Sequence, residues 1–256
     1  MKIAILSGAS SGIGKRFCQR LSEYGRFDEV WLIARHADKL AATAEDMPFS
    51  VRCLALDLTK AEDMEQYAAR LETEKPEVAL LMNISGFGKF AAVMDTPLDD
   101  NLNMVDLNCK AVLAMCQLTV PYMPRGSQIV NISSVAAFQP IPYIDVYGAT
   151  KAFVLSFSRA LNRELAPQGI AVLAVCPYWT KTDFFDRAID PAQQTVVKKY
   201  VALYSPDDVV NATWKAIRRG KDYTIVGFKS KAQTLLAKLL PHSLIMTAWM
   251  KQQKLG

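Results

Sequence analysis

The segment Ser7-Gly8-Ala9-Ser10-Ser11-Gly12-Ile13-Gly14 completes a short apolar run, residues 3–7, and leads into a helix-like segment. Glycines in such a turn let the backbone bend tightly and approach a phosphate without a Cβ in the way. The N-terminus of the following helix would offer free N–H groups to the same phosphate. The spacing G-x-x-x-G-x-G differs from the G-x-G-x-x-G fingerprint, and many strand–helix turns need glycine only for packing. We predict a strand, a phosphate-binding loop and a helix.

Apolar runs of strand character recur along the chain and alternate with longer helix-like segments. Their apolar content is nearly continuous, as in strands that are covered on both faces of a sheet. Residues 98–123 and 146–166 are long enough to form crossover helices. This alternation predicts an α/β fold, a single doubly wound Rossmann-type domain with a parallel seven-stranded sheet. The strand candidates are residues 3–7, 30–34, 51–56, 78–83, 128–133, 171–176 and 223–226.

The composition favours one globular domain. Of the 256 residues, 51% are hydrophobic and 21% are charged, which supplies a buried core. The five cysteines include no C-x-x-C pair, and we expect them to be small buried residues in a reducing cytosol. The apolar start of the chain is too short for a signal peptide, and no run of about 18 apolar residues predicts a membrane span. We therefore expect a cytoplasmic protein.

The end of the second strand candidate bears on the choice of dinucleotide. An acidic residue there would hold the ribose 2′-hydroxyl of NAD, whereas an arginine suits the 2′-phosphate of NADP. The sequence Ala34-Arg35-His36 places Arg35 at this position, and the first acid, Asp38, comes later. The alternative interpretation is a solvated surface arginine. With the glycine loop upstream, we predict NADP(H) as the cofactor.

The sequence Tyr147-Gly148-Ala149-Thr150-Lys151 places a tyrosine and a lysine four residues apart on one face of a predicted helix. A neighbouring ammonium stabilises a phenolate and lowers the tyrosine pKa, which makes the tyrosine a usable acid or base. This spacing alone is common in long helices. Ser133 and Ser134 end the fifth strand candidate, at the sheet edge where α/β proteins bind ligands. Either serine could donate a hydrogen bond to a substrate oxygen, or both could belong to an ordinary turn.

Together these motifs resemble the short-chain dehydrogenase/reductase family over residues 1 to about 227. Ser7 replaces the usual threonine before the family's cofactor loop, and Ile84 replaces an asparagine in the turn that follows the fourth strand. Loss of that polar side chain puts the local hydrogen bonding in doubt. The resemblance implies that the cofactor is contacted by Gly8, Ser10, Ser11, Gly12, Ile13, Gly14, Arg35, Asp57, Leu58, Asn83, Tyr147, Lys151, Pro177, Thr180 and Thr182.

The resemblance also implies a catalytic set of Asn108, Ser134, Tyr147 and Lys151. Ser134 is favoured over Ser133 because it lies thirteen residues before Tyr147, the usual family interval. Tyr147 would be the general acid in carbonyl reduction, and Ser134 would orient the carbonyl. Lys151 would lower the tyrosine pKa and bind the ribose. Asn108 would hold a water molecule for proton relay.

Aromatic residues gather in the segments that would surround the substrate. Apolar walls with few polar groups suit a bulky hydrophobic carbonyl or alcohol, such as a steroid, an acyl chain or a polyketide-like ketone. Alternatively, several of these aromatic residues belong to the core. The sequence does not choose among these substrates. The expected substrate contacts are Phe138, Tyr178, Trp179 and Phe184.

Two classes of function follow from this pattern. The first is an NADP(H)-dependent oxidoreductase that transfers a hydride between nicotinamide and a carbonyl or secondary alcohol. The second is a cofactor-binding protein of the same fold that has lost its chemistry and acts as a sensor or partner. The four filled catalytic positions argue for the enzyme. No grouping of His, Cys and carboxylates predicts a metal site, and no nucleic-acid-binding module is present.

The last part of the chain has a different character from the rest. After Asp222 there is no acidic residue, while five lysines account for the net charge of +5. Pro241 should separate two helices, and Ser243 could cap the second. The apolar positions expected on these helices are Ala232, Leu235, Leu236, Leu239 and Leu240, then Leu244, Ile245, Trp249 and Met250.

We therefore predict a domain at residues 1–228 and a basic amphipathic helical extension at residues 229–256. The apolar faces of the extension would pack over the substrate cleft or against another subunit of a homodimer or homotetramer. The alternative is peripheral contact with an anionic membrane surface, because lysines flank an apolar stripe and no acid dilutes their charge.

Overall fold

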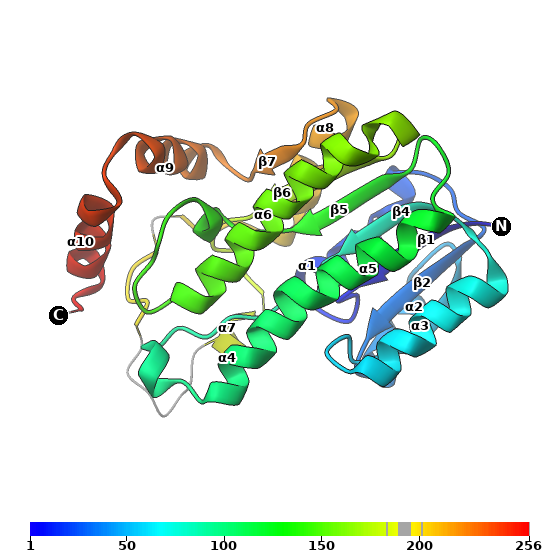
Figure 1. Cartoon of the computed structure of the whole chain (residues 1–256), viewed down its shortest axis with the longest axis horizontal. Coiled ribbons are helices and arrows are strands. Elements are labelled where there is room, and N and C mark those ends of the chain that lie inside the picture. Colours follow the sequence, from blue (N-terminus) through cyan, green and yellow to red (C-terminus); the bar gives the residue numbers. More distant parts are fainter. Residues whose placement is uncertain (183, 189–195, 201, 256) are drawn as a thin grey trace.

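The protein is described here by a computed structural model that covers residues 1–182, 184–188, 196–200 and 202–255. Seven parallel strands form one sheet in the order β3-β2-β1-β4-β5-β6-β7 (Figure 1), which confirms the predicted Rossmann-type fold. Every strand agrees with its predicted range to within one residue at each end. The strands are β1 (Lys2–Ser7), β2 (Glu29–Ala34), β3 (Ser50–Ala55), β4 (Glu77–Asn83), β5 (Gln128–Ile132), β6 (Ala171–Cys176) and β7 (Tyr223–Ile225).

Helices cover both faces of the sheet, so the core has two layers. One layer packs Phe17 and Trp214 against the sheet, and the other packs Tyr67, Met115 and Val154 against the opposite face. The first layer belongs to α1 (Gly12–Gln19), α2 (Ala37–Ala44) and α8 (Pro206–Arg218). The second belongs to α3 (Ala61–Glu74), α5 (Ala111–Thr119) and α6 (Asp145–Leu165). The remaining helices are α4 (Leu98–Val105), α7 (Phe184–Ala188), α9 (Phe228–Leu239) and α10 (His242–Gln253).

Strand β3 lies at the edge of the sheet and departs from the expected burial. Leu54 is buried in it, but Cys53 is exposed, because an edge strand has a neighbour on one side only. The expectation that all five cysteines are buried is therefore wrong for Cys53. The other four, Cys18, Cys109, Cys116 and Cys176, are buried thiols.

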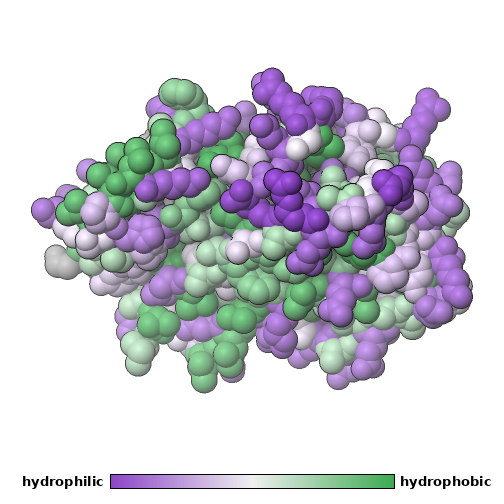
Figure 2. Space-filling model, turned by 45° about the horizontal axis from the view of Figure 1, so that its top comes forward, coloured by the Kyte–Doolittle hydropathy of each residue, from purple (hydrophilic) through white to green (hydrophobic). Residues whose placement is uncertain are grey.

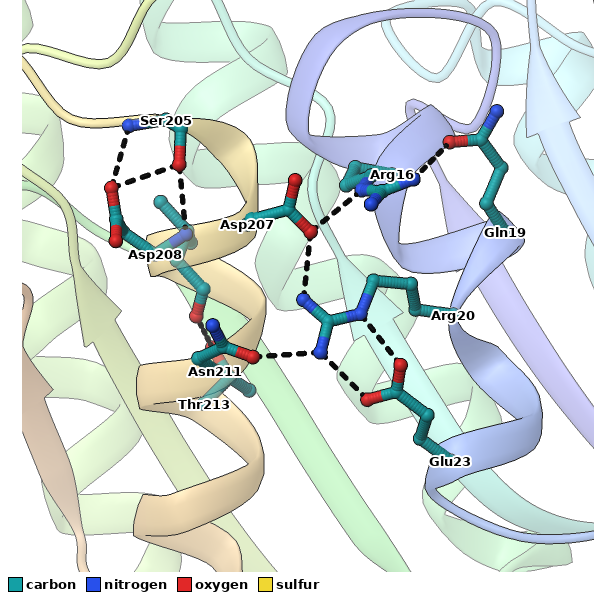
Figure 3. A network of polar contacts seen from close by, with 10 residues as sticks. Arg16, Gln19, Arg20, Glu23, Ser205, Asp207, Asp208, Asn211 and Thr213 are labelled. Carbon is teal, nitrogen blue, oxygen red and sulfur yellow. Dashed lines mark hydrogen bonds and ion pairs between the residues drawn. The ribbon is translucent and has the colours of Figure 1, made fainter.

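Helix α8 is joined to α1 by a polar network (Figure 3). Arg16 and Arg20 of α1 both donate to the same carboxylate oxygen of Asp207, each at 2.8 Å. Ser205 and Asp208 form a capping box that begins α8. Both arginines belong to α1, the helix that follows the glycine loop. This network therefore holds α1 against α8.

The two C-terminal helices were expected, but their orientation and boundary differ from the prediction. In α9 the buried side chains are Ser230, Thr234 and Ala237, while the predicted leucine stripe is exposed. Helix α10 begins at His242 with Pro241 as its N-cap, so Ser243 lies inside the helix and the prediction that it caps the helix is wrong. Across the described ranges of the chain, no helix is long and apolar enough to cross a membrane.

Candidate active site

The glycine loop lies against the turn that follows β4. Gly8 has a φ of 68°, in the left-handed region that favours glycine, and a Cβ there would lie 2.7 Å from the backbone nitrogen of Ser85. A Cβ at Gly14 would overlap the carbonyl oxygen of Gly8. Ser11 is the N-cap of α1 and has an extended backbone. The loop therefore holds bare backbone and a helix N-terminus at the carboxyl edge of the sheet, which fits a phosphate group.

Ser7 supports this arrangement from the end of β1. Its hydroxyl oxygen accepts hydrogen bonds from the backbone nitrogens of Ile84 and Ser85, at 3.1 and 3.2 Å. The turn is thus held through its backbone. It therefore does not need the polar side chain that Ile84 replaces. Asn83 lies deeper. Its amide donates to Asn131 Oδ1 of β5 at 2.8 Å, so this predicted cofactor residue has its side chain in the core.

Three further expected cofactor contacts, Arg35, Asp57 and Leu58, lie just after β2 and β3, whereas Ser10 lies in the glycine loop. Arg35 is exposed, Ser10 is half-buried and Leu58 is buried. Burial by itself raises the pKa of Asp57, but hydrogen bonds from Thr59 and the charges of Arg35 and Lys60 bring that pKa below its usual value.

These residues adjoin the glycine loop through the strand ends. The Gly8 nitrogen donates to the Ile33 carbonyl of β2 at 2.8 Å, and the Leu56 nitrogen donates to the Ala34 carbonyl at 3.1 Å. Arg35 and Asp57 are therefore placed next to the loop, although they do not line the cleft described below.

Tyr147 and Ser134 both line the cavity that is described below. Tyr147 is in the first turns of α6, and Ser134 precedes the 3-10 turn η5 (Val135–Phe138). Burial raises the pKa of the Tyr147 phenol to about 12, and a hydrogen bond with the Ser134 side chain acts in the opposite direction. Ser133 points elsewhere, since its hydroxyl donates to the Lys151 carbonyl at 2.7 Å. The structure thus brings Ser134 rather than Ser133 to the tyrosine.

Lys151 lies one turn along the same helix and is buried. Its Nζ donates to the Ile132 carbonyl at 2.9 Å and lies 5.6 Å from the centroid of the Tyr147 ring. Burial lowers the pKa of Lys151 to about 8. The expected lowering of the tyrosine pKa below its ordinary value is not seen, because desolvation of the phenol raises that pKa more than its surroundings lower it.

Asn108 lies in a π-helical turn (Asp106–Lys110) between α4 and α5, whereas the sequence pattern predicts an unbroken helix. Its Oδ1 accepts from the Phe87 nitrogen at 3.1 Å, and its Nδ2 donates to the Phe87 carbonyl at 2.9 Å and to Thr150 Oγ1 at 3.0 Å. A Cβ at Gly86 would lie 2.9 Å from Asn108 Oδ1 and 3.1 Å from Lys151 Nζ. Glycine at position 86 thus lets Asn108 and Lys151 approach the same stretch of backbone.

A cavity of about 280 Å³, here called the cleft, runs from the glycine loop to Tyr147 and Lys151. Among the expected substrate contacts, Tyr178, Trp179 and Phe184 line it. Phe138 does not, because η5 turns it toward β7, where its ring lies 6.2 Å from that of Tyr223. Other expected contacts that line the cleft are Gly8, Ser11, Gly12, Ile13, Gly14, Ser134, Pro177, Thr180 and Thr182.

The cleft also contains residues that were not among the expected substrate contacts. Gln233 of α9 and Trp249 of α10 line it, and Trp249 Nε1 donates to the Pro142 carbonyl at 3.0 Å. Trp249 had a signal in the sequence, namely its place on the apolar face of the last helix, whereas Gln233 had none. Where the chain is described, no three His, Cys, Asp or Glu side chains are grouped as metal ligands.

Gln253 attaches α10 to the segment after α7. No pattern in the sequence predicted this role. The side chain of Gln253 accepts from the Lys198 and Lys199 nitrogens at 2.7 and 3.0 Å and donates to the Lys199 carbonyl at 3.0 Å. Val196 and Val197 pack in the same cluster as Trp249. Helix α10 therefore forms part of the wall of the cleft.

Comparison with known proteins agrees with this geometry. A family model described as short chain dehydrogenase matches residues 2–192. An uncharacterized oxidoreductase of Staphylococcus epidermidis is 28% identical over 216 residues, which cover 81% of this chain and 93% of the relative. A short-chain dehydrogenase from Sphingobium yanoikuyae, solved in complex with NADPH, is 29% identical, with a TM-score of 0.78 over 92% of both chains.

A second solved structure is similar over nearly the whole chain. The bulky-bulky ketone specific alcohol dehydrogenase from Comamonas testosteroni is 26% identical, with a TM-score of 0.74 over 94% of this chain and 95% of that one. The family model alone covers well over half of the chain. The chain therefore belongs to the short-chain dehydrogenase family, whose members are oxidoreductases that use a nicotinamide cofactor.

Proposed function

We propose that the protein is an NADP(H)-dependent oxidoreductase that interconverts a bulky hydrophobic ketone and the corresponding secondary alcohol. The observation that carries the proposal is that Ser134, Tyr147 and Lys151 line one cleft with the glycine loop, with Lys151 Nζ 5.6 Å from the centroid of the Tyr147 ring. Bare backbone at the loop and a buried cation near the tyrosine fit a dinucleotide that extends from phosphate to nicotinamide. When bound, the nicotinamide supplies or accepts the hydride.

The residues of this chain transfer the proton that accompanies the hydride. With a pKa of about 12, Tyr147 is protonated at neutral pH and can give its proton to a carbonyl oxygen as that oxygen gains charge. Ser134 orients the same oxygen by a hydrogen bond. Lys151, with a pKa of about 8, is mostly cationic at neutral pH and stabilises the phenolate that remains. Asn108 is a positioning residue, because it bonds the backbone of Phe87 and the hydroxyl of Thr150 next to Lys151.

The preference for NADP(H) rests on Arg35. This arginine is exposed at the end of β2, and its charge is close enough to Asp57 to help lower that carboxyl's pKa. A 2′-phosphate on the adenosine ribose would meet a cation there rather than an acid. The similar protein from Sphingobium yanoikuyae was solved with NADPH, which supports the proposal.

The substrate class rests on the walls of the cleft. The ring of Phe90 packs against the rings of Tyr147, Trp179 and Phe184, with centroid distances of 6.3, 5.6 and 6.1 Å. Such walls favour a substrate with apolar groups on both sides of its carbonyl. The similar alcohol dehydrogenase from Comamonas testosteroni, which is specific for bulky-bulky ketones, points the same way.

We further propose how the whole protein is organised. Residues 1–228 would form the catalytic domain and residues 229–256 its helical extension, of which Gly256 lies outside the described residues. The exposed apolar side chains of α4 would bind a second copy of the chain. All five cysteines are free thiols, which supports a reducing, cytoplasmic setting.

The test is NADPH oxidation across a panel of hydrophobic ketones, with Tyr147→Phe as the matched variant. We expect turnover in the unmodified protein and a loss of at least a hundredfold in Tyr147→Phe, since only the proton donor is removed. NADPH affinity, measured by fluorescence titration, should change less than threefold. If NADPH binds but neither protein turns over any ketone, the protein is instead a silent cofactor-binding sensor.

A further inference from the structure

The apolar stripe of α9 faces away from the protein. Surface helices normally turn their apolar side inward, but here Ser230, Thr234 and Ala237 are the buried positions. Phe228 and Leu239 are 85% and 73% exposed. The full exposed set, here called the α9 patch, consists of Phe228, Leu235, Leu236, Leu239 and Leu240, with Leu244 from the first turn of α10.

The patch is contiguous. Figure 2 shows hydrophobic side chains (green) gathered at the upper left, over the end of the molecule that holds α9 in Figure 1. Single exposed leucines are ordinary, but a contiguous apolar group of this kind marks an interaction surface. The large side chains of the helix thus contribute little to its own packing and are available to a partner.

The charges around the α9 patch identify the partner. No acidic residue follows Asp222 in the sequence, and Lys229, Lys231, Lys251 and Lys254 are exposed on α9 and α10 or directly after them. A second copy of the chain bound symmetrically here would bring lysines against lysines, which disfavours the contact. Anionic lipid headgroups would instead pair with the lysines, while the leucines enter the apolar layer beneath.

The geometry points to α9 and the start of α10 as a docking surface for an anionic membrane. The other side of the same two helices faces the cleft, because Gln233 and Trp249 line it. A docked α9 would therefore hold the cleft about one helix diameter, roughly 10 Å, from the lipid. This arrangement suits a hydrophobic substrate that partitions into the bilayer, but the docking itself does not depend on the proposed activity.

The experiment is co-sedimentation of the full chain with phosphatidylcholine vesicles, with and without phosphatidylserine, at low and high salt. We expect binding to the phosphatidylserine vesicles at low salt and at least a tenfold weaker partition at high salt, since screening weakens the lysine contribution. Leu236→Ser/Leu239→Ser should lower the partition at least tenfold. So should Lys229→Glu/Lys231→Glu, because it reverses two charges beside the patch.

The matched control is Val93→Ser/Met94→Ser, which removes two exposed apolar side chains from a different surface. It should bind vesicles as the unmodified chain does, and thermal unfolding should show that all variants fold. Ketone reduction in solution should be unchanged in the α9 variants, which separates this inference from the proposed function. Absence of binding to phosphatidylserine vesicles at low salt, or equal loss in the control, would overturn the inference. So would a fall in molar mass for Leu236→Ser/Leu239→Ser in solution, which would assign the patch to a second copy.

Discussion

At the scale of single residues, Lys151 opposes the stability of the fold in which it is buried. Burial lowers its pKa from 10.5 to about 8, so between these two pH values the unfolded chain binds more protons than the folded one. Stability therefore rises with pH over this window, and below about pH 8 the penalty of burying the ammonium is present in full. The cation is retained beside Tyr147, where it stabilises a phenolate.

Lys151→Met should therefore stabilise the protein at pH 7 while abolishing turnover. The gain should be roughly 1–3 kcal/mol, which is less than the full pKa shift implies, because the Ile132 carbonyl loses its donor. Urea unfolding at pH 7 and at pH 10 measures it, and the difference between the two proteins should shrink at pH 10. A variant less stable than the unmodified chain at pH 7 would contradict this account.

Arg35 offers a second test at the residue scale. Arg35→Asp should weaken NADPH binding at least tenfold and leave NADH binding within about threefold, because only the former carries the 2′-phosphate. Fluorescence titration of both cofactors gives the ratio. Arg26→Asp is the matched control, since Arg26 is also exposed but precedes β2 rather than following it. Equal affinity of the unmodified chain for both cofactors would refute the preference.

At the scale of elements, the strands could be predicted because each is an apolar run long enough to cross a buried sheet. The exposed positions of β3 could not be predicted, since only the strand order shows that β3 lies at the edge of the sheet. The π turn around Asn108 depends on bonds to Phe87 and Thr150, which are distant in sequence. For α9, helical periodicity correctly indicated an apolar face, but periodicity carries no information on which way that face points.

The residues of the site likewise divide into those that the sequence could place and those that it could not. Tyr147, Lys151 and the glycine loop could be placed from the sequence because short spacings fix their relation within one helix or turn. Gln233 and Trp249 reach the cleft through the path of the C-terminal helices. That path is a tertiary property that no local pattern encodes.

The attachment of α10 can be tested through Gln253. Gln253→Ala would leave the buried bonds to Lys198 and Lys199 unmade, so we expect a stability loss of about 1–3 kcal/mol. It should also raise KM for a hydrophobic ketone several-fold with less change in kcat, because Trp249 would no longer be held in the wall. Steady-state kinetics measure both, with the neighbouring Gln252→Ala as control. A change of stability without any change of KM would show that the helix has no part in substrate binding.

At the scale of the whole molecule, two exposed apolar surfaces differ in charge. Lysines of α9 and α10 flank the α9 patch, and no acidic residue follows Asp222 in the sequence. The surface of α4 exposes Leu98, Leu102 and Val105 on one helical face, with Asp99 and Asp106 in or directly after the same helix and Lys110 paired with Asp106 at 2.7 Å. Mixed charges allow a symmetric contact between two copies, whereas a one-sign surface does not. We therefore propose self-association through α4 and lipid docking through α9.

Leu102→Glu should accordingly reduce the molar mass in solution to that of one chain, 28.4 kDa, because a symmetric interface would bury the new carboxylate twice without a partner. Light scattering after size-exclusion chromatography measures the mass, and the unmodified protein should give a multiple of that value. Leu239→Glu, an equivalent change in the α9 patch, should leave the multiple intact and remove vesicle binding. The assignment fails if Leu239→Glu, and not Leu102→Glu, separates the subunits, or if the unmodified chain already has the mass of a monomer.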